Sequence, residues 1–292
     1  MTDAALPRAR RRLDPWAVTA LVACVFALIC LAGVGFGSTW IAPGKVIEVI
    51  LGGGDKGERL IVLQLRLPRV AAAAIAGGAI AFAGYLLQRI TRNELASPGV
   101  LGVVDGAALG VVMFLTIFSN ESSALTVPVA WQPLAAALGA VTAVGLVFVL
   151  AGRQASSAIR LLLFGIAIAA LCKAFITMFM LAGPVYQVSQ AARWLAGAVN
   201  TIKPSEINIM LAVLIPTAMI AAIAARHLPP ADLDDTSSRA IGLNLPVYRL
   251  FVVLLAALLT AGAVAFAGGV SFVGLLAPHL ARLLVGRARA AG

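Results

Sequence analysis

Long stretches with almost no charged side chains recur along the whole chain and constrain its fold more than any other feature. The hydrocarbon core of a bilayer is about 30 Å thick, so a helix needs about 20 apolar residues to cross it. Of the 292 residues, 61% are hydrophobic and 12% are charged, whereas roughly a quarter of the residues in a soluble domain are charged. We therefore expect eight membrane spans, at residues 16–36, 67–87, 100–118, 127–151, 158–182, 205–226, 249–267 and 270–286.

The expected fold class is all-α, a polytopic transmembrane helical bundle that forms a single domain over residues 1–292. The alternating pattern of a membrane β-barrel is missing from the sequence, and helices are the other way to satisfy backbone hydrogen bonds in lipid. A basic tail, residues 1–15, precedes the first apolar run. That run is longer than the apolar part of a signal peptide and lacks a convincing cleavage site, so we interpret it as the first span.

The distribution of basic residues predicts the orientation of the chain. The net charge of +10 does not indicate nucleic-acid binding, because the basic residues are scattered between apolar segments instead of gathered on one face. With a cytoplasmic N-terminus, fourteen lysines and arginines fall on the inner side and seven on the outer side. Cytoplasmic loops carry an excess of basic residues, so this bias predicts a cytoplasmic N-terminus.

Two connections between spans are more than plain turns. The outer one, residues 37–66, contains a short helix expected over 43–51, with Pro43 at its start and Gly52 to Gly54 at its end. The inner one, residues 227–248, has helix-capping residues on both sides of Gly242, which indicates two short helices in a cytoplasmic projection. Such a projection could be pushed by a soluble motor, and a plain solvated loop is the alternative.

Small residues within the spans indicate close helix packing. Gly102, Gly106 and Gly110 recur every four residues, which places them on one helical face that a neighbouring backbone can approach. Three cysteines also lie in apolar spans without the spacing of metal ligands, and we interpret them as packing residues: Cys24, Cys30 and Cys172.

The sequence carries no motif for nucleotide, metal or covalent chemistry. Gly52 to Gly57 is glycine-rich but lacks the Lys-Ser/Thr of a P-loop, so any ATP must be bound by another chain. His227 and His279 lie far apart, without cysteine or carboxylate neighbours at ligand spacing. Ser271 lies eight residues from His279, without an oxyanion-hole signature. We therefore expect no catalytic residue, no metal and no cofactor.

Three basic residues stand out by position. Arg66 and Arg69 lie on the outer side, three residues apart and so on one helical face. They suit carboxylates on a docking partner, or lipid headgroups. Lys173 falls within the fifth span, where exposure to lipid would cost about 2.5–3.5 kcal/mol, so it should face the bundle interior, water or the interface. Pore lining and simple packing both remain open for Lys173.

Several motifs, in order along residues 40 to 286, resemble those of the FecCD family of ABC importer permeases. Unrelated apolar helices would not reproduce this order. The motifs are Leu65–Arg69, Gly84 with Gln88, Asn93–Pro98 with Leu101 and Gly102, Trp194–Gly197, Ala240–Leu243, and Gly268–Arg282.

The resemblance implies a permease of the bacterial cytoplasmic membrane that works as a dimer with an identical or homologous second copy. It implies import of iron-siderophore complexes, haem or cobalamin, with two ATPase subunits inside and a binding protein outside. By the same resemblance, Arg66 and Arg69 match the arginines that receive acidic residues of the binding protein. The residues expected to couple to the ATPase are Asp235, Ser238, Arg239, Ala240, Gly242 and Leu243.

The chain departs from the family pattern at several points. Glu94 stands where the family usually has proline, and Gly268 to Phe272 differ from the usual Gly-Pro-Ile-Gly-Phe. The family has ten spans, so two C-terminal helices are expected to be absent. The alternative function is an ion-coupled secondary transporter, which would need charged residues near the membrane midplane. Asp105 and Lys173 are the candidates for that role.

Overall fold

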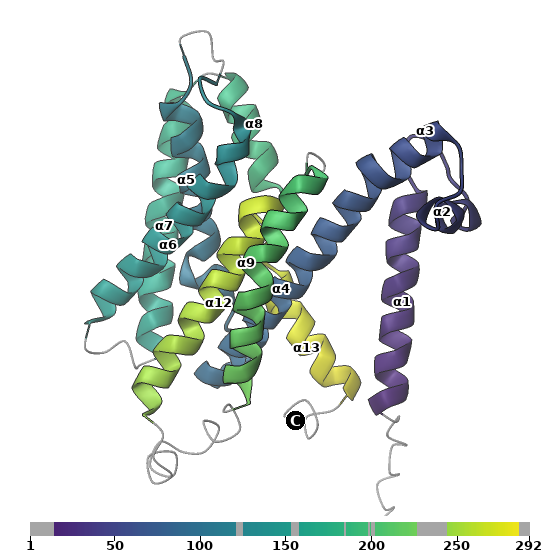
Figure 1. The fold of residues 1–292 in the computed structure, drawn as a ribbon. Coiled ribbons are helices and arrows are strands. Elements are labelled where there is room, and N and C mark those ends of the chain that lie inside the picture. Colours follow the sequence, from purple (N-terminus) through teal and green to yellow (C-terminus); the bar gives the residue numbers. More distant parts are fainter. Residues whose placement is uncertain are drawn as a thin grey trace, which may run out of the picture.

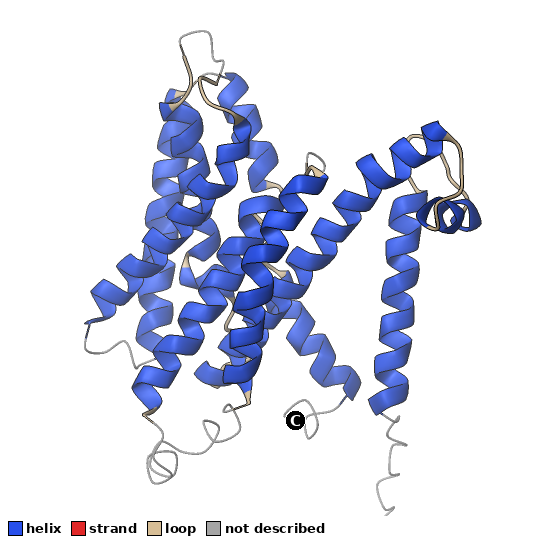
Figure 2. Cartoon of the chain, in the orientation of Figure 1, coloured by secondary structure: helices blue, strands red, loops and turns tan. Residues whose placement is uncertain are grey.

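The structure is a computed structural model that describes residues 15–120, 125–152, 158–183, 185–197, 199, 202–226 and 244–285. Within these ranges every named element is helical, which confirms the all-α prediction (Figure 2). The elements are α1 (Pro15–Gly35), α2 (Pro43–Ile50), α3 (Lys56–Arg59), η1 (Leu60–Arg66), α4 (Leu67–Thr91), η2 (Pro98–Leu101), α5 (Val103–Ile117), η3 (Val129–Trp131), α6 (Gln132–Ala151), α7 (Ala158–Ala182), α8 (Val185–Leu195), α9 (Pro204–Ala225), α12 (Leu245–Ala267) and α13 (Val273–Val285).

All eight expected spans contain a helix, but the helices differ in length. Six of those in the described residues are long and apolar enough to cross a membrane: Trp16–Gly35, Lys56–Thr91, Val129–Ala151, Ile159–Ala182, Pro204–Ala225 and Val247–Ala267. The other two, α5 and α13, begin three residues later than expected and are each only about 20 Å long. For α5 the local backbone explains the late start, because Gly102 has a positive φ of 75° and separates η2 from α5.

The helices form one main bundle, and α1 stands beside it (Figure 1). In the bundle α12 packs against α4, α6 and α9, while α5 packs against α6 and α7. Of the most apolar stretch of α12, 72% of the residues are buried, against 11% in α1. We call the end of the molecule that carries α2 and α3 the α2 end. At the opposite end α1 begins, α4 and α9 end, and α12 begins (Figure 1).

A second, smaller apolar core joins α1 to the α2 end. Val34, Val46, Val49 and Val62 are nearly inaccessible and pack together there, apart from the main core. As expected, α2 has Pro43 in its first turn and ends just before the glycines at 52–54.

The helix of the second span begins before residue 67, where the expected span starts. The backbone N–H of Asp55 donates to Glu58 Oε2 at 2.9 Å, and the chain then runs as one helical stretch from Lys56 to Thr91. Lys45 lies 3.2 Å from Glu48 and 3.5 Å from Glu58 and so ties α2 to α3. The hydrogen bond to Glu48 and the charges of both glutamates raise the pKa of Lys45.

Arg66 connects the long helical stretch to α1. Its Nη1 donates to the backbone oxygens of Val34 at 3.0 Å and Gly35 at 2.8 Å, and its Nη2 donates to Thr39 O at 2.6 Å. The last carbonyl groups of a helix lack partners within it and carry partial negative charge, so a guanidinium satisfies both needs. The side chain is therefore buried, with only 8% of the residue exposed.

Glycine permits a close backbone contact between α5 and α6. A Cβ at Gly139 would overlap the carbonyl oxygen of Gly106, and one at Gly110 would overlap that of Ala135. Gly145, on the same helix as Gly139, faces open space, since an added Cβ would meet no atom within 4 Å.

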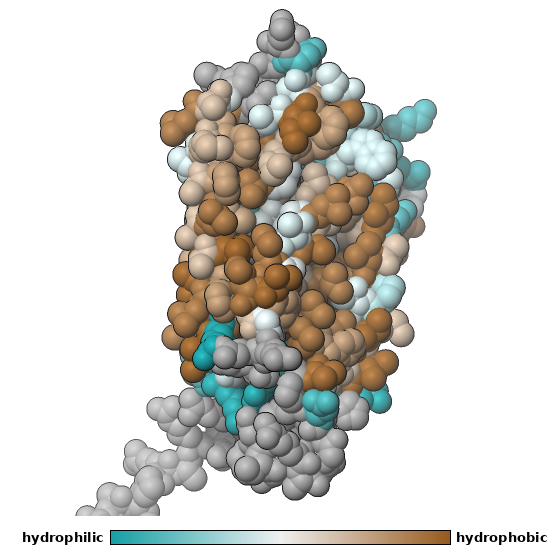
Figure 3. Space-filling view, turned by 90° about the vertical axis from the view of Figure 1, so that its left-hand side faces the viewer, coloured by the Kyte–Doolittle hydropathy of each residue, from teal (hydrophilic) through white to brown (hydrophobic). Residues whose placement is uncertain are grey.

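The outer surface agrees with a membrane location. On the face that lies to the left in Figure 1, apolar side chains form a broad band, and hydrophilic residues gather toward the two ends (Figure 3). Many of the large apolar side chains of α6 and α7 are exposed, including Leu138, Val149, Leu163 and Leu181. In water such a surface would promote aggregation, whereas lipid or another subunit can cover it.

A substitution at Gly139 tests the contact between α5 and α6. Gly139→Ala should lower the melting temperature of the purified protein in detergent, because overpacking typically costs about 1–3 kcal/mol. The matched control is Gly145→Ala on the same helix, which should melt no lower than the wild type. Equal melting temperatures for the two variants would contradict the contact.

Substitution of Arg66 tests its role as the partner of the α1 carboxyl end. Arg66→Gln should lower the free energy of unfolding by about 2 kcal/mol or more, because hydrogen bonds to charged groups each contribute about 1.5–3 kcal/mol. Arg69→Gln, one turn further along an exposed face, should change it by less than about 0.5 kcal/mol. Thermal unfolding in detergent gives the comparison, and a larger loss for Arg69→Gln would refute it.

Candidate functional site

Segments far apart in the sequence meet between α4, α13 and the turn before η2. A Cβ at Gly84 on α4 would overlap the carbonyl oxygen of Gly274 on α13. One at Gly274 would lie 2.9 Å from Pro98 Cδ and 3.1 Å from Ile80 O. Three backbones therefore come together at a point where only glycine leaves enough room.

Polar side chains extend this junction toward the end opposite α2. Gln88 Nε2 donates to Leu275 O at 3.3 Å, and Gln88 Oε1 accepts a 2.7 Å hydrogen bond from Arg282 Nη2. Glu94 lies 4.0 Å from both Arg282 Nε and His279 Nδ1. The loop after α4 is shaped by Asn93, whose Oδ1 accepts the Leu95 N–H at 2.9 Å. These contacts hold α4, the following loop and α13 as one unit.

The segment before α13 is also joined to the end of α8. The backbone N–H of Gly269 donates to Trp194 O at 3.0 Å, and a Cβ at Gly269 would lie 2.5 Å from Leu195 O. Gly197, just beyond α8, has a positive φ of 79°, which glycine adopts without strain. Residues 194–197 and 268–271 thus depend on each other for their positions.

A cavity of about 590 Å³ lies between these joined segments and α7. Its size falls within the range of about 300–1,000 Å³ typical of small-molecule sites. The wall combines apolar side chains with the exposed backbone of two glycines and two serine residues. The lining that bears on chemistry consists of Ser97, Gly99, Asp105, Lys173, Gly269 and Ser271.

An ion pair lies in the wall of this cavity. Lys173 Nζ on α7 lies 3.7 Å from Asp105 Oδ1 in the first turn of α5. The Lys173 side chain is 69% exposed and that of Asp105 is 19% exposed. A lysine in the middle of a span avoids lipid by facing water or protein, and the cavity lets Lys173 do so. Of the two roles considered for Lys173, pore lining and simple packing, the structure therefore favours a place in the cavity wall.

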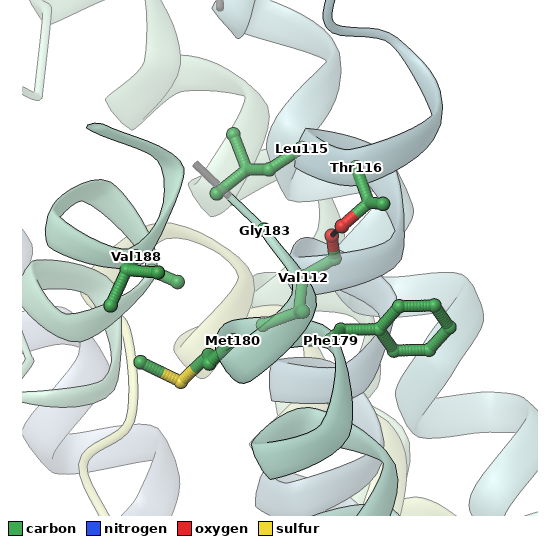
Figure 4. Close-up of a pocket in the computed structure, with 8 residues that line it drawn as sticks. Val112, Leu115, Thr116, Phe179, Met180, Gly183 and Val188 are labelled. Carbon is green, nitrogen blue, oxygen red and sulfur yellow. Dashed lines mark hydrogen bonds between the residues drawn. The ribbon is translucent and has the colours of Figure 1, made fainter. Parts of the chain in front are cut away.

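Between the cavity and the α2 end, α5 and α7 pack closely against each other. Figure 4 shows Val112, Leu115 and Thr116 of α5 facing Phe179 and Met180 of α7, with Val188 of α8 beside them. The space left is about 10 Å³, no more than a water molecule needs. The Thr116 hydroxyl is satisfied within its own helix, because it donates to Val112 O at 2.9 Å. An apolar constriction thus lies next to the charged cavity.

The three glycines predicted to share one helical face contact two different helices. Gly106 and Gly110 face α6, whereas Gly102 precedes α5 and faces α7, with an ideal Cβ 3.3 Å from Gly165 O. The partner glycines, Gly139 and Gly165, were not among the predicted packing residues. Each of them is a glycine within a neighbouring expected span, and that feature of the sequence could have predicted its role in packing.

The two predicted docking arginines differ in accessibility. Arg69 is exposed near the α2 end, whereas Arg66 is buried against the end of α1. Both line a smaller cavity of about 360 Å³ beside Gly37 and Thr39. Six predicted coupling residues lie outside the described residues, as does most of the basic tail: Asp235, Ser238, Arg239, Ala240, Gly242 and Leu243.

Metal binding by the protein itself finds no support in the described part of the chain. There, no group of three or more histidine, cysteine, aspartate and glutamate residues is placed to hold a metal ion. Cys172 is buried, and its neighbour Lys173 is the residue that reaches the cavity.

Comparison with known proteins places the chain in a family. The model of the FecCD transport family matches residues 24–291. A probable siderophore transport system permease protein of Bacillus subtilis is 36% identical over 93% of this chain and 79% of its own length. The achromobactin transport system permease protein of Dickeya dadantii is 36% identical over 88% of this chain and 72% of its own length.

A solved structure supports the same fold. It is described as an inward-facing conformation of a metal-chelate type ABC transporter and matches with a TM-score of 0.79 at 23% identity, over 95% of this chain and 84% of that one. Four of the motifs that suggested the resemblance meet at the glycine junction and the cavity: Gly84 with Gln88, Asn93–Pro98, Trp194–Gly197 and Gly268–Arg282. The chain therefore belongs to the FecCD transport family.

Proposed function

We propose that this chain is the membrane-spanning permease subunit of a binding-protein-dependent ABC importer for iron(III)-siderophore complexes, with haem and cobalamin as the next candidates. The observation that carries the proposal is the 590 Å³ cavity, whose wall is built from the family motifs and lined by an ion pair. The name of the Bacillus subtilis relative, which refers to siderophore transport, supports the choice of cargo. The cargo passes through unchanged, so the chain itself carries out no covalent chemistry.

The passage lies between two copies of the permease or between this chain and a homologue. Support comes from the exposure of α7, since Lys173 and Ala170 line the cavity and yet remain open on the bundle surface. A second subunit across this face would complete the wall and exclude lipid from the charged side chains. The constriction around Met180 then closes one end while the cavity is accessible from the other, as alternating access requires.

The α2 end is the extracytoplasmic side in this proposal, and the N-terminus is cytoplasmic in the bacterial inner membrane. The charge bias between the two sides supports this orientation. Arg69, exposed at the α2 end, offers its guanidinium to carboxylates of a substrate-binding protein. Arg66 stabilises that surface without being exposed on it, because its hydrogen bonds hold the end of α1 against the long helical stretch that contains Arg69.

ATP hydrolysis is supplied by separate subunits on the opposite side. The residues proposed to contact them are the six from Asp235 to Leu243 named above, which the sequence places between α9 and α12. Both α9 and α12 reach the end opposite α2, so a projection between them would face the cytoplasm (Figure 1). Closure of the ATPase pair would move two such projections together and change the access of the cavity.

Uptake into liposomes tests the function. The permease should be reconstituted with its ATPase and binding protein and supplied with radioactive ferric siderophore. Uptake should require both partners and ATP and should fall at least tenfold without either one. Uptake by the permease alone, driven by a proton or sodium gradient, would instead favour the ion-coupled secondary transporter.

The coupling role can be tested by copurification of the ATPase. Arg239→Glu and Gly242→Pro should each reduce the copurified ATPase by more than tenfold, since one reverses a charge and the other breaks the expected turn. Arg160→Glu reverses an exposed charge at the same end, at the start of α7, and serves as the matched control. If the control lost the ATPase as completely as the two variants, the assignment of residues 235–243 would be wrong.

Charge reversal at Arg69 tests docking of the binding protein. Arg69→Glu should weaken its affinity at least tenfold, because loss of one partner of a charge pair that docking buries costs about 2–5 kcal/mol. Lys56→Glu, exposed on α3 at the same end, should weaken it less than threefold. Binding is measured on nanodiscs by surface plasmon resonance, and equal effects of the two reversals would point to general charge attraction.

A further inference from the structure

The two charged side chains that line the large cavity are unequally accessible to a passing molecule. Lys173 exposes 69% of its side chain and Asp105 only 19%. Their closest charged atoms, Nζ and Oδ1, are 3.7 Å apart, so Asp105 orients the ammonium group without covering it. The positive member of the pair is therefore presented to the cavity, and the negative member is withdrawn into the wall.

The helix ends at the cavity strengthen this asymmetry. Asp105 lies in the first turn of α5, where unpaired backbone N–H groups and the helix dipole stabilise a carboxylate. Lys173 is thus not the only group that offsets the charge of Asp105, and the ammonium group keeps most of its surface open to the cavity. A second helix, α13, begins next to Phe272 and Leu275 of the same wall and adds further positive potential.

From this charge pattern we infer that Lys173 makes the cavity selective for ferric chelates with a net negative charge, such as catecholate or polycarboxylate complexes. An ammonium group offers three hydrogen-bond donors, which suit the anionic oxygens at the rim of such a chelate. An uncharged trihydroxamate complex would gain less from Lys173. This inference rests on the proposed function and specifies its substrate class.

The first experiment compares two cargoes in the complete importer. Radioactive iron is offered to proteoliposomes as a tris-catecholate complex, which is anionic, and as a trihydroxamate complex, which is neutral. Lys173→Gln should lower the ratio of anionic to neutral uptake about tenfold, and Lys173→Arg should restore it. Leu181→Gln, at an exposed position on α7 outside the cavity lining, should leave the ratio unchanged.

The second experiment measures the potential in the cavity without any cargo. In a background with serine at Cys24, Cys30 and Cys172, a cysteine replaces Ala170, which lines the cavity one turn from Lys173. The ratio of labelling rates with an anionic and a cationic thiol reagent should fall about tenfold in Lys173→Gln, as expected for one unit charge at short range. It should rise in Asp105→Asn, which removes the opposite charge.

The outcomes separate this inference from the function on which it rests. Uptake of neither chelate by a complete importer would refute the iron-siderophore assignment, and the labelling ratio would still report the potential. Uptake of the neutral chelate alone, or an equal loss of both in Lys173→Gln, would overturn the inference and leave the importer intact. A labelling ratio that moved in the same direction in Lys173→Gln and Asp105→Asn would overturn it as well.

Discussion

At Gly84, α4 approaches the carbonyl oxygen of Gly274 so closely that any side chain would overlap it, and the arrangement of the rest of the site follows from that contact. The same approach sets Gly274 against Pro98 and so fixes the turn that begins η2 and α5. In lipid the hydrophobic effect does little to hold helices together, and close packing of small residues takes its place. The glycines thus set the position of the cavity without lining most of it.

Polar side chains inside the bundle each find a different partner. Arg66 binds the carbonyl end of α1, Gln88 bridges α4 and α13, and Lys173 pairs with Asp105 in the cavity wall. The first two are buried and locked by hydrogen bonds to backbone, so they stabilise the fold. Lys173 is held by one ion pair and remains exposed, as its proposed contact with the cargo requires.

The proposed transport cycle divides the molecule into parts with separate tasks. The small core around Val46 and Val62 fixes α1 and the end that receives a binding protein, while the glycine junction holds α4 and α13 together. Between them, the charged cavity and the apolar constriction at Met180 belong to α5, α7 and α8.

The fold class, the eight helical segments and the family could be predicted from the sequence, because lipid crossing demands long apolar runs and the motifs keep their order. The starts of α5 and α13 were each predicted three residues too early, and at α5 the reason is the left-handed backbone of Gly102, which separates η2 from α5. The packing of the helices sets the inward turn of Arg66, the exposure of Arg69 and the pairing of Lys173 with Asp105. Those outcomes depend on distances between helices remote in sequence, which no local pattern of residues encodes.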